Sequence, residues 1–281
     1  MRDEQQQQQQ QQTQRDIIDA LQVQPARDAA QEAGARLAFL EQYLLDHGGN
    51  AYVLGISGGI DSTTAGRLAQ LAVERVRARG HEATFIAVRL PYGTQKDEDD
   101  AQQALAFIRP DISIAVDIKP AADAMMAALG DNLNHADEAQ RDFLLGNIKA
   151  RQRMIAQYAL AGAHGGFVLG TDHAAEAVMG FFTKYGDGGF DLAPLAHLNK
   201  RQVKALAAAL GAPERLVEKP STADLEDLAP QKSDEDAFGM TYDEIDDFLE
   251  GKPVGQDAFD KITTAWAKTM HKRMLPAVPE R

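Results

Sequence analysis

The sequence predicts an α/β protein: a doubly wound, mostly parallel sheet with helices on both faces and extra helices at the C-terminal end. Short apolar runs rich in Val and Ile alternate with helical patterns between residues 51 and 169, as expected when parallel strands are buried on both faces. The first of these runs ends in a glycine-rich turn that opens a helix. Such turns bind ligands at the carboxyl edge of an α/β sheet.

The N-terminal region divides into a leader, residues 1–22, and the start of a single domain, residues 23–281. Gln5 to Gln12 form an unbroken low-complexity tract with nothing to bury, so we expect either a frayed leader or the solvated start of a helix. Apolar residues recur at helical spacing over 25–46, and His47-Gly48-Gly49-Asn50 ends that helix.

Strands and helices then alternate. We predict strands at residues 51–56, 83–90, 112–118 and 166–169, with helical patterns at 62–79, 97–108 and throughout a longer stretch, 120–163. Ligands of such sheets bind at the carboxyl ends of the strands. The loops of interest therefore follow Ile56, Leu90, Ile118 and Leu169.

The C-terminal third has a different character. Residues 184–194 are rich in Gly, Asp and Pro and predict a loop, and residues 219–236 are polar, proline-bounded and expected to be mobile. Helices are predicted at 199–210, ended by Gly211, and at 242–250 and 256–270.

Composition excludes several classes of function. The formal net charge of −13 opposes broad binding to nucleic acid or to an anionic membrane. There is no apolar run long enough to cross a bilayer and no apolar signal core near the N-terminus. The absence of cysteine removes disulfides, thiolate metal sites and cysteine nucleophiles. We expect a cytoplasmic protein.

The stretch 53–62, VLGISGGIDS, carries the most specific chemistry. A glycine-rich turn at a helix start presents backbone N–H groups to phosphate, and Gly58 and Gly59 let phosphates approach closely. Asp61 suits Mg²⁺ on a polyphosphate. The stretch lacks the lysine of a Walker loop and the spacing of the dinucleotide fingerprint. The simpler alternative is an ordinary turn, with Asp61 or Ser62 capping the helix.

This string resembles the pyrophosphate-binding loop of the ATP pyrophosphatases, which cleave ATP between the α and β phosphates and transfer AMP to an oxygen. Other segments are similar, in the same order, to the ammonia-dependent NAD synthetases. They are residues 146–159 (GNIKARQRMIAQYA), 170–191 (GTDHAAEAVMGFFTKYGDGGFD), 198–203 (LNKRQV), 221–227 (STADLED), 241–251 (TYDEIDDFLEG) and 271–273 (HKR).

The resemblance implies a reaction. The nicotinate carboxylate of deamido-NAD receives AMP from ATP, and ammonia then displaces AMP from the acyl adenylate to give NAD. This is the last step of NAD biosynthesis. Because the chain has no cysteine, it has no thiolate to hydrolyse glutamine. Free ammonia is therefore the expected nitrogen donor, unless a separate amidase partner supplies it from glutamine.

The resemblance also assigns roles. Asp61, Glu176 and Lys200 are the expected catalytic residues, and Asp61 and Glu176 hold Mg²⁺, two ions with ATP. The expected ATP contacts are Gly55, Ile56, Ser57, Gly58, Gly59, Ile60, Asp61, Ser62, Arg89, Gln95, Thr171, Lys200 and Thr222. The expected deamido-NAD contacts are Arg151, Lys184, Asp191, His271 and Lys272. His173 is interpreted as a helix-start residue, and Phe181 or Phe182 as core or as a stacking partner of nicotinate.

The family further implies a homodimer, with the helix around 147–161 as a candidate interface. Three alternatives stay open. A tRNA-modifying pyrophosphatase would be expected to show a basic face and, in thiolating members, cysteines. A GMP synthetase module would need its own nucleobase-binding segments. A non-catalytic adenine-nucleotide sensor could dispense with Asp61, Glu176 or Lys200, all of which are present.

Overall fold

A four-stranded parallel sheet forms the centre of the molecule. The computed structural model describes residues 2–25, 28–93, 98–223, 228 and 232–279. The strands are β1 (Ala51–Gly55), β2 (Thr84–Arg89), β3 (Ile112–Ala115) and β4 (Gly166–Val168), in the order β3-β2-β1-β4. The predicted fold class is confirmed, although β3 ends three residues before the predicted boundary at 118.

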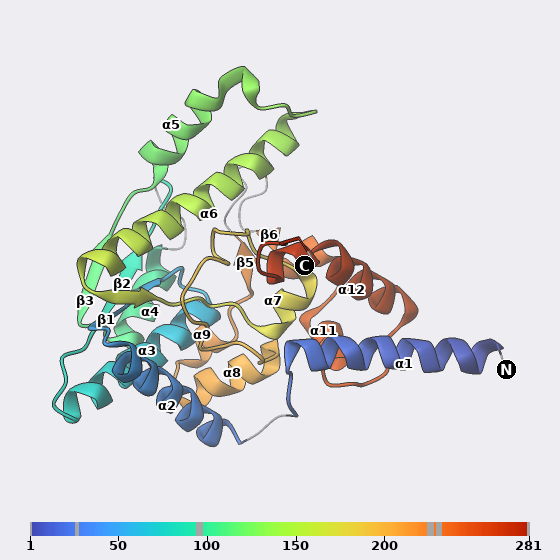
Figure 1. The fold of residues 1–281 in the computed structure, drawn as a ribbon, viewed down its shortest axis with the longest axis horizontal. Helices are drawn as coiled ribbons and strands as arrows, with labels where there is room; N and C mark the ends of the chain where they lie inside the picture. Colours follow the sequence, from blue (N-terminus) through green and yellow to red (C-terminus); the bar gives the residue numbers. More distant parts are fainter. Residues whose placement is uncertain (1, 26–27, 94–97, 224–227, 229–231, 280–281) are drawn as a thin grey trace.

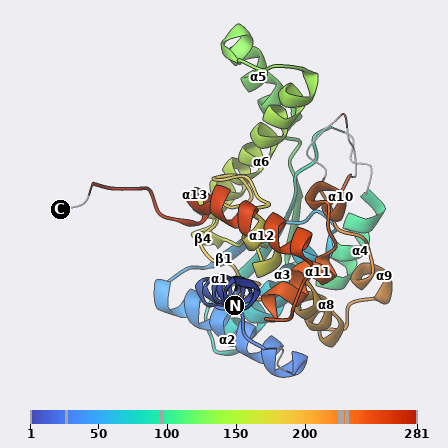
Figure 2. The same ribbon diagram turned by 90° about the vertical axis from the view of Figure 1, so that its right-hand side faces the viewer.

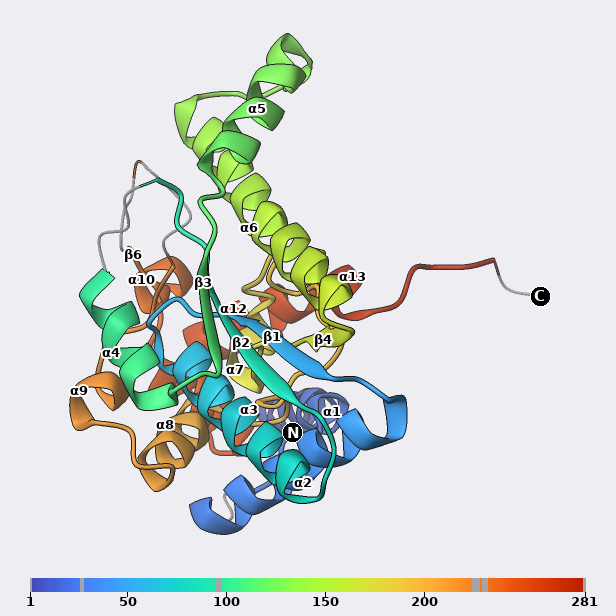
Figure 3. The same cartoon turned by 90° about the vertical axis from the view of Figure 1, so that its left-hand side faces the viewer.

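Alternation of side chains along the strands builds two cores. In β1, Tyr52 and Leu54 belong to the core that the sheet shares with α2 (Ala29–His47), α3 (Ile60–Ala78) and α8 (Lys200–Ala209). Ala51 and Val53 point to the opposite face, which is covered by the C-terminal part of α6 (Glu138–Ala163). Figure 3 shows the strands between α6 on one side and α3 on the other.

The stretch predicted as one helical pattern, 120–163, is two helices. α5 (Lys119–Leu129) stops at Gly130, which has a φ of 45°, and a 3₁₀ turn, η1 (Gly130–Asn132), follows. α6 begins after Asp137, whose side chain accepts a hydrogen bond from Gln140 N at 2.8 Å. α5 and the first part of α6 project beyond the sheet (Figure 1).

The C-terminal third supplies short helices around the end of the sheet. They are α7 (Ala174–Met179), α8, α9 (Glu214–Val217), α10 (Asp234–Phe238), α11 (Tyr242–Leu249), α12 (Gln256–Lys268) and α13 (Met270–Arg273). The predicted terminal helices are present, with a break at Thr269 inside the second one. The chain then leaves the body (Figure 2).

Residues 219–236 were expected to be a loop, but their described parts hold regular structure. β5 (Thr222–Ala223) pairs antiparallel with β6 (Lys232–Ser233), and α10 begins at Asp234. The Ser233 side chain caps α10 by accepting a hydrogen bond from Asp236 N at 3.0 Å. α4 (Glu98–Ile108) matches the described part of the helix predicted at 97–108.

The glutamine tract lies in a helix, α1 (Arg2–Leu21), so of the two expected states the helical one is correct. Gln5 to Gln9 are exposed, and their half of α1 extends past the body (Figure 1). Ile17, which is 2% exposed, packs in an apolar cluster with α7, α11 and α12. Gln14 donates to Phe248 O at 2.8 Å and Lys252 O at 2.9 Å, satisfying carbonyls where α11 ends.

No helix within the described residues is long and apolar enough to span a bilayer.

We predict that Ile17→Ala lowers the free energy of unfolding by about 2 to 5 kcal/mol, because it opens a cavity between α1 and α7. Gln8→Ala, on the exposed part of the same helix, should stay within about 0.5 kcal/mol of wild type. Urea unfolding measures both. Equal stability of the two variants would show that α1 is not held by its apolar face.

Candidate active site

A cavity of about 460 Å³ opens at the carboxyl edge of the sheet. The chain runs from β1 through β2 to β3 on one side and then returns with β4 on the other side of β1. Ligands of open α/β sheets bind at such a reversal of strand order. The loops after β1, β2 and β4 line the cavity, so three of the four expected loops meet there. The loop after Ile118 does not contribute to the wall.

The glycine-rich loop after β1 is ordered by its own hydroxyls. Ser57 Oγ lies 3.1 Å from Ser62 Oγ and accepts a hydrogen bond from Gly59 N at 3.2 Å. Gly58 has a φ of 85°, and a Cβ there would lie 2.8 Å from Ala101 N in α4. Only glycine fits that conformation and that contact. The loop thus presents the start of α3 to the cavity.

A charged cluster lies directly beside this loop. Lys200 Nζ donates to both oxygens of Asp61, at 2.9 and 2.8 Å, across 139 positions of sequence. The Lys200 side chain is 3% exposed. Glu176, from the first turn of α7, completes the cluster on the other side of the cavity floor. The three residues predicted to be catalytic therefore converge.

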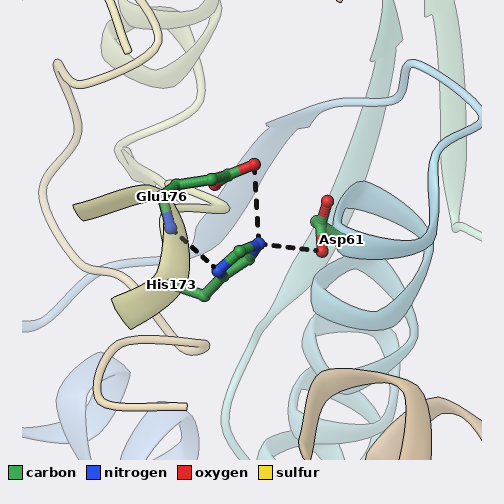
Figure 4. Close-up of side chains that lie close together, drawn as sticks. All are labelled: Asp61, His173 and Glu176. Atoms are coloured by element: carbon green, nitrogen blue, oxygen red, sulfur yellow. Dashed lines mark hydrogen bonds and ion pairs between the residues drawn. The ribbon is translucent and has the colours of Figure 1, made fainter. Parts of the chain in front are cut away.

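His173 connects the two carboxylates (Figure 4). Its Nδ1 accepts the Glu176 backbone N–H at 3.4 Å and so caps α7. Its Nε2 lies 3.2 Å from Lys200 Nζ, 3.4 Å from Asp61 Oδ1 and 3.5 Å from Glu176 Oε1. Burial lowers the pKa of His173 to about 3, so the ring is neutral.

The environment shifts the pKa values of Asp61 and Glu176 in opposite directions. Burial opposes the charge on Asp61, but attraction to Lys200 outweighs it and lowers the pKa of Asp61. Burial, followed by repulsion from Asp61, raises the pKa of Glu176 well above its usual value. Asp61 thus carries the negative charge that balances Lys200. Divergent pKa values of neighbouring carboxyl groups are typical of functional sites.

Lys200 is aimed at Asp61 by the way α8 begins. Asp246 accepts the backbone N–H of Lys200 at 3.0 Å and that of Arg201 at 2.7 Å. Asn199 and Gln202 form a capping box at the same turn. The Lys200 ammonium also lies 4.8 Å from the ring centroid of Tyr242. These contacts fix the base of the lysine while its long side chain reaches the cavity floor.

Several predicted contacts line the cavity. They are Gly55, Ile56, Ser57, Gly59, Asp61, Ser62, Thr171, Glu176, Thr222 and Lys272, together with Phe181 and Phe182. Gly58 and Ile60 lie within the same loop and helix start, and Lys200 lies behind Asp61. Arg89 is ion-paired with Glu98, and its buried Nε has no partner among the described residues. Gln95 lies outside the described residues.

The other predicted dinucleotide contacts lie away from the cavity wall. Arg151 donates to Lys184 O at 3.2 and 3.3 Å, and Lys184 Nζ donates to His271 O at 2.6 Å. Asp191 accepts from Val168 N at 2.7 Å and ties its loop to the edge of β4. The structure thus joins Arg151, Lys184 and His271 in one chain of contacts, and of the predicted dinucleotide contacts only Lys272 lines the cavity.

Sequence reasoning missed Arg153, which lines the cavity and donates to Leu90 O at 3.0 Å. The sequence pattern that could have revealed it is the helical spacing of the residues on its face of α6. Gly146, Ala150, Arg153 and Gln157 all line the cavity, and their spacing of three or four residues marks one face of α6. Lys219, Lys232, Asp172 and Asp234 were also missed; they come from segments whose shape the sequence did not reveal.

The family model described as NAD synthase matches residues 32–276. The chain belongs to the NAD synthase family. An NH(3)-dependent NAD(+) synthetase from Streptomyces coelicolor is 62% identical over 267 residues, covering 95% of this chain and 97% of its own.

Two solved structures show the same fold. An NAD+ synthetase from Burkholderia pseudomallei is 58% identical with a TM-score of 0.82, covering 95% of this chain and 98% of its own. An NMN synthetase from Francisella tularensis is 31% identical with a TM-score of 0.80, covering 91% and 100%.

The donor set of the cluster fits the magnesium ion expected with ATP. The ligand atoms of Asp61, His173 and Glu176 lie within 4.8 Å of one another. Mg²⁺ prefers oxygen ligands and commonly takes one or two carboxylates together with substrate phosphates. Asp61 and Glu176 supply those oxygens beside the glycine-rich loop, whereas His173 orients them.

We predict that Gly58→Ala lowers the free energy of unfolding by about 2 kcal/mol or more, since it combines a strained φ with a collision against α4. Gly59→Ala is the matched control, because Gly59 has a φ of −78° and a Cβ there meets only Ser57 Oγ, at 3.3 Å. It should stay within about 1 kcal/mol of wild type. Thermal unfolding of both variants tests the loop conformation, and a reversed order would contradict it.

Proposed function

We propose that this chain is an ammonia-dependent NAD⁺ synthetase, which amidates deamido-NAD with ATP and ammonia and releases AMP and pyrophosphate. The observation that carries the proposal is the convergence of Asp61, Lys200 and Glu176 beside a phosphate-binding loop. It occurs in a chain 62% identical over 95% of its length to a synthetase of that name.

The chemistry explains why charge is concentrated there. A nicotinate carboxylate oxygen attacks the α phosphorus of ATP, the bond to the β-phosphate oxygen breaks, and pyrophosphate leaves. Ammonia then attacks the acyl carbon of the adenylate, a proton is lost, and AMP leaves with the carboxylate oxygen. The first step brings two anions together, so it needs fixed positive groups at the reacting atoms.

This chain supplies such groups from several elements. We assign the N–H groups and hydroxyls of the loop at Ser57 to the β and γ phosphates, and Lys200 to the phosphates at the reacting end. Asp61 and Glu176 would hold Mg²⁺, and we expect two ions. When bound, these ions would neutralise phosphate charge. Arg153 and Lys272 line the same cavity, Lys272 beside Phe182, and both suit the anionic dinucleotide.

The remaining assignments stay predictions. Thr171 and Thr222 line the cavity where ATP is expected. We assign Arg89 and Gln95 to the adenosine, and Arg151, Lys184, Asp191 and His271 to deamido-NAD, where their distance from the wall calls for a substrate that extends beyond the cavity. Residues 23–281 would form the catalytic domain, in the cytoplasm.

A product assay tests the function directly. With ATP, Mg²⁺, ammonium and deamido-NAD, we expect NAD, AMP and pyrophosphate in equal amounts. ADP and phosphate would contradict the assignment of the loop. Nicotinate mononucleotide is tested as a second acceptor, because the Francisella relative is an NMN synthetase. If the enzyme preferred it, deamido-NAD would no longer be the proposed substrate. Binding of ATP without turnover of any acceptor would favour a sensor.

Asp61→Asn should lower the rate of NAD formation by about 10²-fold or more, because it removes the anionic partner of both Lys200 and the metal. Asp46→Asn, on the exposed side of α2, is the matched control and should keep wild-type activity. Both are measured with the same product assay. Normal turnover by Asp61→Asn would refute the metal role.

We also propose a homodimer that uses α6. Ile155 is 53% exposed and Tyr158 37% exposed, one turn apart on the part of the helix that covers the sheet. Large exposed apolar side chains grouped on a helix mark interaction surfaces. A dimer across this face would bring a second subunit close to the substrate region around Lys184.

Ile155→Asp should convert the dimer into monomers, because it buries a charge in the apolar contact. Met125→Asp, on the projecting α5, is the control and should leave the assembly unchanged. Sedimentation velocity measures both. A monomeric wild type, or a dimer in Ile155→Asp, would exclude this interface.

A further inference from the structure

In the ion pair at the cavity floor, Lys200 donates to both carboxylate oxygens of Asp61, a residue that we expect to bind the metal. Lys200 Nζ lies 2.8 Å from one oxygen of Asp61 and 2.9 Å from the other. The same nitrogen lies 3.2 Å from His173 Nε2. The lysine side chain is 3% exposed and Asp61 17%, so little water screens the pair.

A divalent cation must compete with this ammonium for Asp61. Magnesium binds carboxylate oxygen at about 2.0–2.1 Å. An ammonium already shared between both oxygens would lie within a few ångströms of such an ion. Two positive charges so near each other, in a site that largely excludes water, repel strongly. Because the pair Asp61–Lys200 is already neutral, the centre attracts a free divalent ion only weakly.

A polyphosphate at the glycine-rich loop changes the competition. The loop and Asp61 belong to the same turn, so phosphate oxygens held there lie within reach of a lysine that already extends to Asp61. Phosphate oxygens offer the ammonium a stronger anionic partner than one carboxylate. The backbone of Lys200 stays fixed by Asp246 while its long, rotatable side chain turns from one partner to the other.

We infer that Lys200, in addition to contacting phosphate, makes divalent-metal binding at Asp61 conditional on a bound polyphosphate. Without phosphate its ammonium holds Asp61, and with phosphate it releases that carboxylate to the metal. The inference rests on the proposed function, because it takes a polyphosphate as the occupant of the loop. It predicts a coupling between metal and nucleotide that passes through one side chain.

The test measures Mn²⁺ binding by electron paramagnetic resonance at pH 8, with neither nucleotide nor deamido-NAD present. Lys200→Met should bind Mn²⁺ at least tenfold more tightly than wild type, which corresponds to about 1.4 kcal/mol. Lys204→Met is the matched control on the same helix, where Lys204 Nζ lies 3.8 Å from Glu218, and should bind as wild type does. Adding Asp61→Asn to Lys200→Met should abolish the gain.

A second measurement uses the wild-type chain and needs no variant to fold. The ¹⁵N signal of the Lys200 ammonium should stay in place when Mg²⁺ is added alone. It should move when Mg²⁺ is added with α,β-methylene-ATP, which presents the phosphates but cannot be cleaved between its α and β phosphates.

The outcomes separate the inference from the proposed function. Unchanged or weaker Mn²⁺ binding in Lys200→Met, or an ammonium signal that moves with Mg²⁺ alone, overturns the inference even in an enzyme that makes NAD. Failure to make NAD overturns the function, and neither binding experiment uses deamido-NAD or ammonia.

Discussion

The contact between Asp61 and Lys200 is the constraint on which the site depends. It joins the start of α3 to the start of α8, and through His173 it also reaches α7. Replacing a buried ion pair by apolar residues is often neutral or stabilising, so a buried pair is weak support for a structural purpose. Its position at the reversal of strand order, beside a loop built for anions, indicates a chemical one. Three helices from distant parts of the chain are oriented around a single carboxylate.

The helices behind the cavity keep this arrangement in place. Asp246 in α11 holds the first turn of α8, while the apolar face of α11 packs against α7 in the cluster that contains Ile17. Burial is the main reason that the pKa of Asp246 is raised, to about 6, and the two backbone N–H groups that it accepts partly offset this. The C-terminal helices and α1 therefore support the residues that face the substrate, although they contribute few of the cavity walls themselves.

Much of the fold and the centre of the site could be predicted from sequence, because their signals are local. Strand–helix alternation gave the parallel sheet, and the Ser57 loop is one contiguous string. Apart from Arg153, the features that were missed depend on weak local signals or on contacts between distant segments. Arg153 was missed, although it lies on the same face of α6 as Gly146 and Gln157. The break between α5 and α6 depends on Gly130 and the Asp137 cap, which are weak against the strong helical pattern around them. The pairing of Lys200 with Asp61 spans 139 positions and is a property of topology alone.

The attachment of α1 has a consequence for how the chain is made. Its apolar side packs against residues between 174 and 262, and Gln14 bonds carbonyls 234 and 238 positions away. Contacts of such long sequence separation form late, since they require closure of nearly the whole chain. On the ribosome, α1 cannot pack against α7, α11 and α12 until those helices have been made. The apolar side of α1 around Ile17 therefore has no native partner until the segment 174–262 has been made.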